Sequence, residues 1–279
     1  MTVCVVHLVR YVNGTEPFRR FVQSYVENRA GQVHDLLVVL KGFDRSSSFS
    51  EYERILDGLK YYVYSVNDTG FDILPYYRVM KRFNYEYFCF INSYSIILDE
   101  DWLAKLYSHV CREEIGLAGV TGSYESVYLT ALKEIHASRS LPQSVVNWLR
   151  LRFYKNWFPP FPNYHIRTNG FMISRDSFQM VRVRRILRKI DAMRFESGKN
   201  SLTRQVARMG LRSVVVGKNG LAYETGEWWK SNTYAQGDQN NLLILDNRTA
   251  KYAEGDIKER HLISQVAWGG KANPDASST

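Results

Sequence analysis

The first part of the chain alternates short apolar runs with stretches in which apolar side chains recur every three or four residues. Short, nearly continuous apolar runs are typical of strands buried on both faces, and the longer period is typical of helices. Strands are predicted at residues 3–9, 34–40, 61–66 and 87–91, with helices at 17–30, 51–60 and 71–83 between them. This repeated order predicts an α/β fold with a mostly parallel sheet and right-handed crossovers.

The second part of the chain is less regular. Asp101 is expected to cap a helix, Pro159 to end a helical region, and Ser174 to open a strongly basic helix that runs to Arg194. The predicted elements are helices at 102–112, 127–158, 175–194 and 202–209, strands at 115–120, 164–174 and 212–216, and a loop at 195–201. Beyond residue 216 the pattern weakens, so this region is expected to be an extension of the main domain.

Length and composition set the overall organisation. The chain has 279 residues and is 45% hydrophobic, which suffices for one large core. We predict a main domain at 1–217, an extension packed on it at 218–271, and a frayed tail at 272–279. Without a basic leader, a spanning apolar segment or paired cysteines among Cys4, Cys89 and Cys111, the chain is expected in the cytoplasm.

The net charge of +9 favours anionic partners. Much of it lies between Arg175 and Arg194, where a solvated helix face is expected. No nucleic-acid-binding motif accompanies the charge, so no nucleic-acid partner is predicted. The aromatic and basic residues between Arg139 and Trp157 offer a surface for peripheral association with the inner face of a membrane.

The chain is organised around the apolar run at residues 87–91 and the polar residues that follow it. Asn92, Ser93 and Ser95 stand at the carboxyl end of this predicted strand. In open α/β sheets, ligands bind in the crevice outside the carboxyl ends of the strands. The same residues would also suit a simple turn.

The order of these parts resembles the GT-A type glycosyltransferases, and most closely the inverting enzymes of family 2. The resemblance covers roughly residues 3–216. It rests on six pieces of sequence in the family's order: 5–14, 37–44, 67–72, 90–103, 167–175 and 196–210. It implies the GT-A fold, a nucleotide-sugar donor, and a saccharide or lipid-linked saccharide as acceptor.

One departure from the family concerns the metal. The family's Asp-x-Asp motif binds a divalent cation that holds the donor diphosphate, whereas this chain has Asn92, Ser93 and Ser95 there. Hard cations such as Mg²⁺ and Mn²⁺ prefer carboxylate oxygens. Neutral hydrogen-bond donors with arginine or lysine could hold the diphosphate instead. The sequence therefore predicts no metal-binding residues, no required cofactor, and a weak or absent dependence on Mg²⁺ or Mn²⁺.

The second departure concerns the general base. The family's acidic motif aligns with Gly198 and Lys199, and the nearest carboxylate is Glu196. An inverting transfer needs a carboxylate to accept the proton of the acceptor hydroxyl. Glu196 is therefore the candidate base, with Asp191 a distant second. The alternative is a carboxylate that only stabilises a helix N-terminus.

The resemblance suggests binding residues, and the paired tryptophans beyond it could form an aromatic platform for a sugar ring. On the donor side these are Arg10, Tyr11, Lys41, Asp44, Asp68, Asp72, Asn92, Ser93 and Ser95; on the acceptor side they are His165, Arg167, Thr168, Asn169, Trp228 and Trp229. Each has a structural alternative. The aspartates suit turns and helix caps, the histidine suits a structural hydrogen bond, and the tryptophan pair suits the packing of the extension.

Three functions compete on this reading. The first is an inverting, metal-independent glycosyltransferase of surface polysaccharide or glycan assembly. The second is a non-catalytic nucleotide- or polyanion-binding module with the same fold. The third is a nucleotidyltransferase, which ranks last because the chain lacks a glycine-rich phosphate loop and metal carboxylates.

Overall fold

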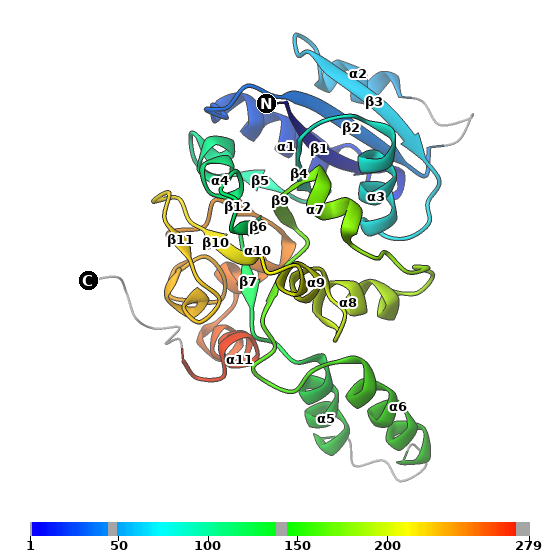
Figure 1. The fold of residues 1–279 in the computed structure, drawn as a ribbon, viewed down its shortest axis with the longest axis vertical. Helices are drawn as coiled ribbons and strands as arrows, with labels where there is room; N and C mark the ends of the chain where they lie inside the picture. The colour runs from blue at the N-terminus through cyan, green and yellow to red at the C-terminus, as the bar shows by residue number, and fades with distance from the viewer. Residues whose placement is uncertain (1, 44–48, 138–143, 272–279) are drawn as a thin grey trace.

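A twisted eight-stranded sheet forms the centre of the molecule (Figure 1). The computed structural model describes residues 2–43, 49–137 and 144–271. The sheet order is β11-β10-β6-β9-β4-β1-β2-β3. The strands are β1 (Val3–Arg10), β2 (Asp35–Lys41), β3 (Tyr61–Val66), β4 (Tyr87–Ile91), β6 (Ile115–Gly119), β9 (Gly170–Ser174), β10 (Arg212–Val216) and β11 (Ala222–Tyr223).

The pairing of the strands confirms the predicted α/β class. Strands β1, β2, β3 and β4 run parallel, and β6 runs parallel to β10. Strand β9 lies between β4 and β6 and is antiparallel to both, so it joins the two parallel groups. Short two-stranded sheets join β5 (Ile96–Ile97) to β12 (Ile244–Leu245), and β7 (Gly122–Ser123) to β8 (His165–Ile166).

Helices cover both faces of the sheet, and each face has its own apolar cluster. Along β1, Val5 faces one cluster and Val6 the other, which is the two-residue period of a strand. The helices are α1 (Glu16–Glu27), α2 (Ser50–Ile55), α3 (Ile73–Arg82), α4 (Trp102–Val110), α5 (Val127–Ala137), α6 (Ser144–Trp157), α7 (Arg175–Met180), α8 (Lys189–Ser197), α9 (Leu202–Arg208), α10 (Asn247–Glu254) and α11 (Ile257–Trp268).

The predicted basic helix from Arg175 to Arg194 is wrong. Helix α7 ends at Met180, residues 181–188 are non-helical, and α8 begins at Lys189. The side chain of Gln205 explains the break, because its Oε1 accepts the backbone N–H of Arg182 at 2.8 Å and its Nε2 donates to the carbonyl of Arg182 at 3.4 Å. A hydrogen-bond partner from α9 thus replaces the next helical turn.

Helix α8 also replaces the predicted loop at 195–201, since it extends to Ser197. Glu196 therefore lies in the last turn of a helix. The predicted strand at 164–174 is divided into β8 and β9, because the two halves pair with different strands and residues 167–169 lie between them.

The predicted cap of α4 forms differently. Asp101 precedes the helix in a left-handed conformation with φ 54°, and its side chain makes no cap hydrogen bond. Its carboxylate instead forms an ion pair with Arg29, at 3.1 Å. The preference of aspartate for helix starts located the boundary correctly, but the side chain of Asp101 pairs with Arg29 instead of capping the helix.

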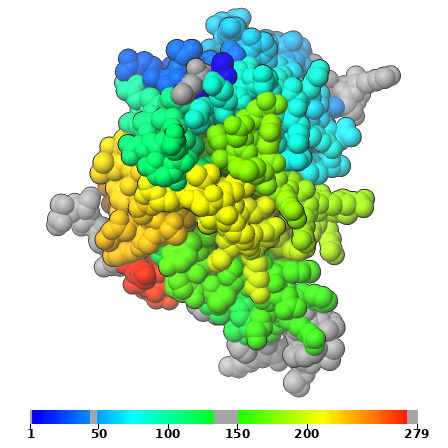
Figure 2. All heavy atoms as spheres, viewed as in Figure 1, coloured from blue at the N-terminus to red at the C-terminus, as the bar shows by residue number. Residues whose placement is uncertain are grey.

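Helices α5 and α6 form a hairpin that projects from the body of the molecule (Figures 1 and 2). The helical character expected for 127–158 holds for these two helices, and the connection at 138–143 lies outside the described residues. On the described part of α6, Phe153 is 51% exposed. Within the described ranges, no helix is long and apolar enough to cross a membrane.

The C-terminal extension packs against the sheet through two tryptophans. Trp228 and Trp268 are fully buried in the same apolar cluster as Val6 and Phe90 of the sheet. The Nε1 of Trp228 donates to the carbonyl of Tyr223 at 3.0 Å. Trp228 has no exposed face for a sugar ring, so its predicted role as an acceptor platform is wrong, and the packing alternative describes it. The predicted tail at 272–279 lies outside the described residues.

Replacing Trp228 by alanine is expected to lower the free energy of unfolding by about 3–5 kcal/mol, because it opens a large cavity in the core. Trp229, which is half-buried beside it, is the matched control. Trp229→Ala is expected to cost roughly 1–2 kcal/mol, in proportion to the smaller apolar area it buries. Urea unfolding of the two variants measures the difference, and equal losses would contradict the packing described here.

Candidate functional site

A cavity of about 570 Å³ opens at the carboxyl ends of β1, β2 and β4. This is the edge at which ligands bind in open α/β sheets. Its walls are Leu8, Arg10, Asn13, Lys41, Asp68, Thr69, Gly70, Phe71, Asp72, Asn92, Ser93, Tyr94, Ile186, Leu187 and Asn247. The cavity thus brings together six of the predicted donor-side residues: Arg10, Lys41, Asp68, Asp72, Asn92 and Ser93.

A carboxylate between two cations forms one wall. Arg10 donates from Nε and Nη2 to the two carboxylate oxygens of Asp68, at 2.9 and 2.8 Å, and Nζ of Lys41 lies 3.3 Å from Asp68 Oδ1. The hydrogen bonds from Arg10 lower the pKa of Asp68. Burial lowers the pKa of Lys41, against the opposing effect of Asp68. Because one carboxylate faces two cations, this wall keeps a positive excess.

Asn92 is held in one orientation by its neighbours. Its Oδ1 accepts the backbone N–H of Tyr94 at 3.1 Å and the hydroxyl of Ser95 at 2.9 Å. A backbone N–H can only donate, so the oxygen of the amide must occupy this position. The Nδ2 amino group, which is a pure donor, is therefore the part of Asn92 that can meet a ligand in the cavity.

Ser95 takes a different place from the one predicted. It is fully buried, and its hydroxyl positions Asn92 instead of lining the cavity. Ser93, which is 9% exposed, does line the cavity. Of the polar residues after β4, Asn92 and Ser93 thus line the cavity, whereas Ser95 orients Asn92.

Asp72 lines the cavity, and Glu196 lies near enough for its charge to act on Asp72. Burial raises the pKa of Asp72 from its ordinary 3.8 to about 6, and the neighbouring charge of Glu196 adds to the rise. Glu196 reaches this point from the last turn of α8, and its Oε1 accepts the backbone N–H of Thr168 at 2.9 Å. A fixed carboxylate beside the cavity suits the acceptance of a proton.

The predicted acceptor-side residues at 165–169 are buried around Glu196. Nδ1 of His165 donates to the carbonyl of Asn163 at 2.8 Å, which leaves Nε2 as the acceptor of a neutral ring. Burial lowers the pKa of His165, although the nearby charge of Glu196 opposes the change. Asn169 accepts from the hydroxyl of Thr121 at 2.8 Å, and its buried Nδ2 has no partner among the described residues.

Arg167 forms a buried ion pair that sequence reasoning missed. Its Nη2 lies 2.8 Å from Oδ2 of Asp246, and its guanidinium lies 4.2 Å from the ring centroid of Tyr234. Both partners come from the C-terminal extension. The signal available in the sequence was Arg167 itself, because a buried arginine requires a carboxylate partner. Arg167 therefore has a structural role in the site, because Asp246 already neutralises its charge.

Two other predicted residues, Tyr11 and Trp229, do not line the cavity. Tyr11 is 44% exposed and contacts Phe43 edge to face, with 5.2 Å between the ring centroids. Trp229 is half-buried beneath the ammonium group of Lys230. Asp44 lies outside the described residues. Within the described ranges, no group of three or more His, Cys, Asp or Glu side chains is arranged to hold a metal ion.

Comparison with known proteins finds similarity only among solved structures. No family model and no curated protein matches the chain. The mannosyltransferase PcManGT of Pyrobaculum calidifontis, solved with GDP-Man and Mn²⁺, is 13% identical over 80% of this chain and 56% of that one, with a TM-score of 0.43.

Two further structures are similar at the same level. Glucosyl-3-phosphoglycerate synthase of Mycobacterium tuberculosis, solved with Mn²⁺, UDP and glucosyl-3-phosphoglycerate, is 15% identical over 75% of this chain and 67% of that one, with a TM-score of 0.42. S. aureus TarS 1–349 is 13% identical over 64% of this chain and 48% of that one, with a TM-score of 0.38. The chain spans less than half the length of the TarS chains it matches. Identities and scores of this size assign no activity to the chain.

The raised pKa of Asp72 makes the stability of the protein depend on pH. Between about pH 4 and pH 6 the folded protein keeps a proton that the unfolded chain has lost, so the contribution of Asp72 to the free energy of unfolding falls as pH rises through this window. Asp72→Asn removes the ionisation. Its free energy of unfolding is expected to exceed that of the wild type by roughly 2 kcal/mol at pH 7.5, and the difference should disappear below pH 4.

Urea unfolding at pH 4 and pH 7.5 measures this effect. The exposed Asp57 supplies the control, since Asp57→Asn is expected to change stability by less than about 0.5 kcal/mol at either pH. A stabilisation by Asp72→Asn that is equal at both pH values would show that buried charge is not its cause.

Proposed function

We propose that the chain is a glycosyltransferase that binds a nucleotide-sugar donor in the cavity at the carboxyl ends of β1, β2 and β4. One observation carries this proposal. A cationic wall at Arg10 and Lys41 and the amide donor of Asn92 meet in one cavity, with the fixed carboxylate of Glu196 beside it. The first two groups suit a diphosphate, and the third suits an acceptor hydroxyl. The resemblance of the sequence to GT-A type enzymes supports the same function.

In this proposal, the donor diphosphate is held by hydrogen-bond donors and side-chain cations, without a required metal ion. Arg10 and Lys41 would supply positive charge, and Nδ2 of Asn92 would donate to a phosphate oxygen. Arginine suits this task because its guanidinium donates in a fixed fork that matches phosphate oxygens. Asp68 would hold the two cations in place when the donor is absent.

The proposed reaction inverts the anomeric carbon of the sugar. The oxygen of an acceptor hydroxyl attacks this carbon as the bond from the carbon to the diphosphate oxygen breaks. Glu196 accepts the hydroxyl proton, and the nucleoside diphosphate leaves with the bonding electron pair. The pKa of Asp72, raised to about 6 by burial and by the charge of Glu196, would limit the negative charge that faces the leaving group near this pH.

The metal-free donor site predicts how nucleotides stabilise the protein. UDP, GDP, dTDP and CMP are compared by thermal shift, each with Mn²⁺ and with a chelator. At least one diphosphate is expected to raise the melting temperature equally under both conditions, because a ligand that binds only the folded state stabilises it. A shift that appears only with Mn²⁺ would overturn metal independence, and no shift with any nucleotide would overturn the donor site.

Asn92→Asp tests the same point from the protein side. The new carboxylate would repel a diphosphate, so binding in chelator is expected to weaken by about tenfold or more, and Mn²⁺ is expected to restore part of it. Asn67→Asp is the matched control, since Asn67 is exposed and does not line the cavity. Unchanged binding in the Asn92→Asp variant would show that the amide does not contact the diphosphate.

Glu196→Gln tests the assignment of the base. Removing the carboxylate is expected to lower kcat by about 10²- to 10⁴-fold, the usual contribution of a general base. The thermal shift produced by the nucleotide should remain, because Glu196 acts on the acceptor. Turnover is measured as release of nucleoside diphosphate, and Glu53→Gln, on an exposed part of α2, serves as control. Full activity of Glu196→Gln would exclude this base, and binding without turnover in the wild type would favour a non-catalytic nucleotide-binding module.

A further inference from the structure

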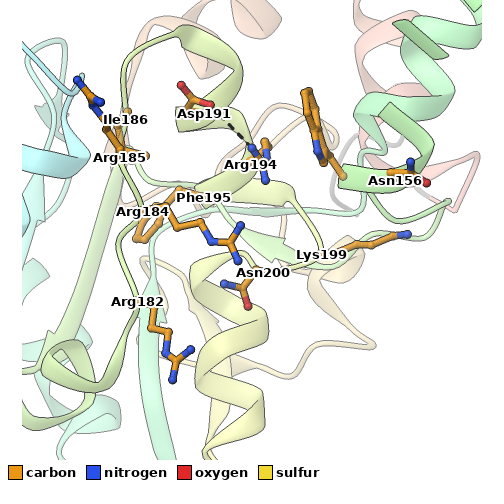
Figure 3. A pocket seen from close by; sticks show the side chains of 11 residues that line it. Asn156, Arg182, Arg184, Arg185, Ile186, Asp191, Arg194, Phe195, Lys199 and Asn200 are labelled. Carbon is orange, nitrogen blue, oxygen red and sulfur yellow. Dashed lines mark ion pairs between the residues drawn. The ribbon is translucent and has the colours of Figure 1, made fainter. Parts of the chain in front are cut away.

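A second cavity lies beside the cavity of the proposed donor site (the donor cavity), and five of its eleven lining residues are cationic (Figure 3). It encloses about 220 Å³ between α6, the non-helical segment at 181–188, α8 and the turn that precedes α9. Its walls are Asn156, Trp157, Arg182, Arg184, Arg185, Ile186, Asp191, Arg194, Phe195, Lys199 and Asn200. Figure 3 shows Arg184 extending toward Asn200 and Arg194 across this space.

The charges of this cavity are unbalanced. Asp191 is its one lining carboxylate, against four arginines and Lys199. The Oδ2 of Asp191 already accepts the backbone N–H groups of Leu187 and Arg188, at 3.1 and 2.9 Å. Its Oδ1 lies 3.9 Å from Arg194. Asp191 is thus occupied by the start of α8 and by one arginine, and among the described residues no other carboxylate lines the cavity.

Hydrogen bonds fix the backbone segments that carry these cations, while the side chains of Arg182, Arg184 and Lys199 are exposed. Gln205 bonds both backbone groups of Arg182, which fixes the segment that carries Arg184. Across the cavity, the guanidinium of Arg194 lies 4.6 Å from a ring centroid of Trp157, and the backbone N–H of Lys199 donates to the carbonyl of Trp157 at 2.8 Å. Among the described residues, no ion pair neutralises Arg182 or Arg184. Like charges held together in this way favour an anion between them.

The size and chemistry of the cavity point to a phosphate group. Guanidinium groups match phosphate oxygens with paired hydrogen bonds, and clustered arginines are a common mode of phosphate recognition. At about 220 Å³ the cavity lies below the usual range for a drug-sized ligand, which begins near ~300 Å³. It therefore suits a phosphate or diphosphate group better than a whole nucleotide sugar.

The position of the cavity gives this anion a role. Ile186 lines both cavities, and Leu187 lines the donor cavity directly after it. We propose that the arginine-lined cavity holds a phosphate or diphosphate group of the acceptor substrate, while the hydroxyl to be glycosylated reaches the donor cavity past Ile186. This assignment of the acceptor class rests on the proposed glycosyltransferase function. Binding of the phosphate group itself does not.

Calorimetric titration of the full chain with inorganic pyrophosphate tests the binding step. Arg184→Gln/Lys199→Gln is expected to weaken the binding by about tenfold or more, since two charge-assisted contacts are lost. Arg112→Gln/Lys258→Gln removes the same charge from exposed positions that do not line the cavity, after the end of α4 and on α11, and is expected to leave the affinity within about twofold. Arg10→Gln reports any binding in the donor cavity.

Farnesyl diphosphate, compared with pyrophosphate, distinguishes the two sources of the group. Equal affinities indicate a soluble phosphorylated acceptor, and tighter binding of farnesyl diphosphate indicates a lipid-linked one. Either result supports the proposal if the Arg184→Gln/Lys199→Gln variant loses that binding. An equal loss in the Arg112/Lys258 variant would overturn it, as would a loss confined to Arg10→Gln. Binding of anionic phosphatidylglycerol vesicles without any binding of pyrophosphate would also overturn it.

The assay of donor binding separates this proposal from the proposed function. If UDP or another nucleotide stabilises the protein and is turned over, but pyrophosphate does not bind at Arg184 and Lys199, only the acceptor assignment fails. If pyrophosphate binds there and no nucleotide binds at all, the phosphate site stands and the glycosyltransferase function fails.

Discussion

The geometry of the candidate site depends on residues 167–169, the connection between β8 and β9. The buried ion pair of Arg167 with Asp246 fixes the position of this connection. Arg167 fixes the strand connection to the C-terminal extension. Thr168 then offers its backbone N–H to Glu196, and the carbonyl of Asn169 accepts the backbone N–H of Asn92 at 3.0 Å. Consecutive residues thus position the candidate base, Glu196, and Asn92, the candidate hydrogen-bond donor to a diphosphate. A rotation of this short segment would displace both groups at once.

Burying an ion pair costs free energy, and removing one of its partners costs more, because the other charge is then buried alone. Removing two charges from water carries a desolvation penalty of several kcal/mol per ion, which close contact only partly repays. The ring of Tyr234 and the hydroxyl of Thr121 supply further contacts to the guanidinium, at 4.2 Å from the centroid and 3.4 Å. We infer that the pair contributes position more than stability. An apolar pair of the same volume would pack as well, but it would not fix the direction of residues 167–169.

The predictable part of the protein is the part whose signals are local. The strands follow from apolar runs, and the donor-side residues follow from their position at strand ends, so Arg10, Lys41 and Asn92 meet in one cavity. The misjudged part depends on partners that are distant in the sequence. The basic helix is broken by Gln205, which lies 23 residues from Arg182.

The same cause explains why the arginine-lined cavity was not foreseen. In a continuous helix, Arg182, Arg184 and Arg185 would point around the axis into solvent. In the extended segment that Gln205 stabilises, all three contribute to one wall of the cavity, and Arg184 extends across it toward Asn200, although the three side chains stay exposed. No periodicity in the sequence signals this change, because the hydrogen bonds that decide it come from another helix. The hydrogen bonds from Gln205 to Arg182 therefore shape the backbone that forms one wall of this cavity.

The charges of the donor cavity also explain why its central position carries amides and hydroxyls. Asp68 is matched by two cations, whereas desolvation and the charge of Glu196 raise the pKa of Asp72 to about 6. Additional carboxylates at positions 92 and 95 would lie at the same strand ends and, without a metal ion, would raise this electrostatic cost further. Lys41 and Arg10 together exceed the charge of Asp68 by one, and further carboxylates would cancel this excess. Neutral donors after β4 and cations at the ends of β1 and β2 are thus two parts of one arrangement, in which, under the proposed function, side chains would supply the positive charge for a diphosphate.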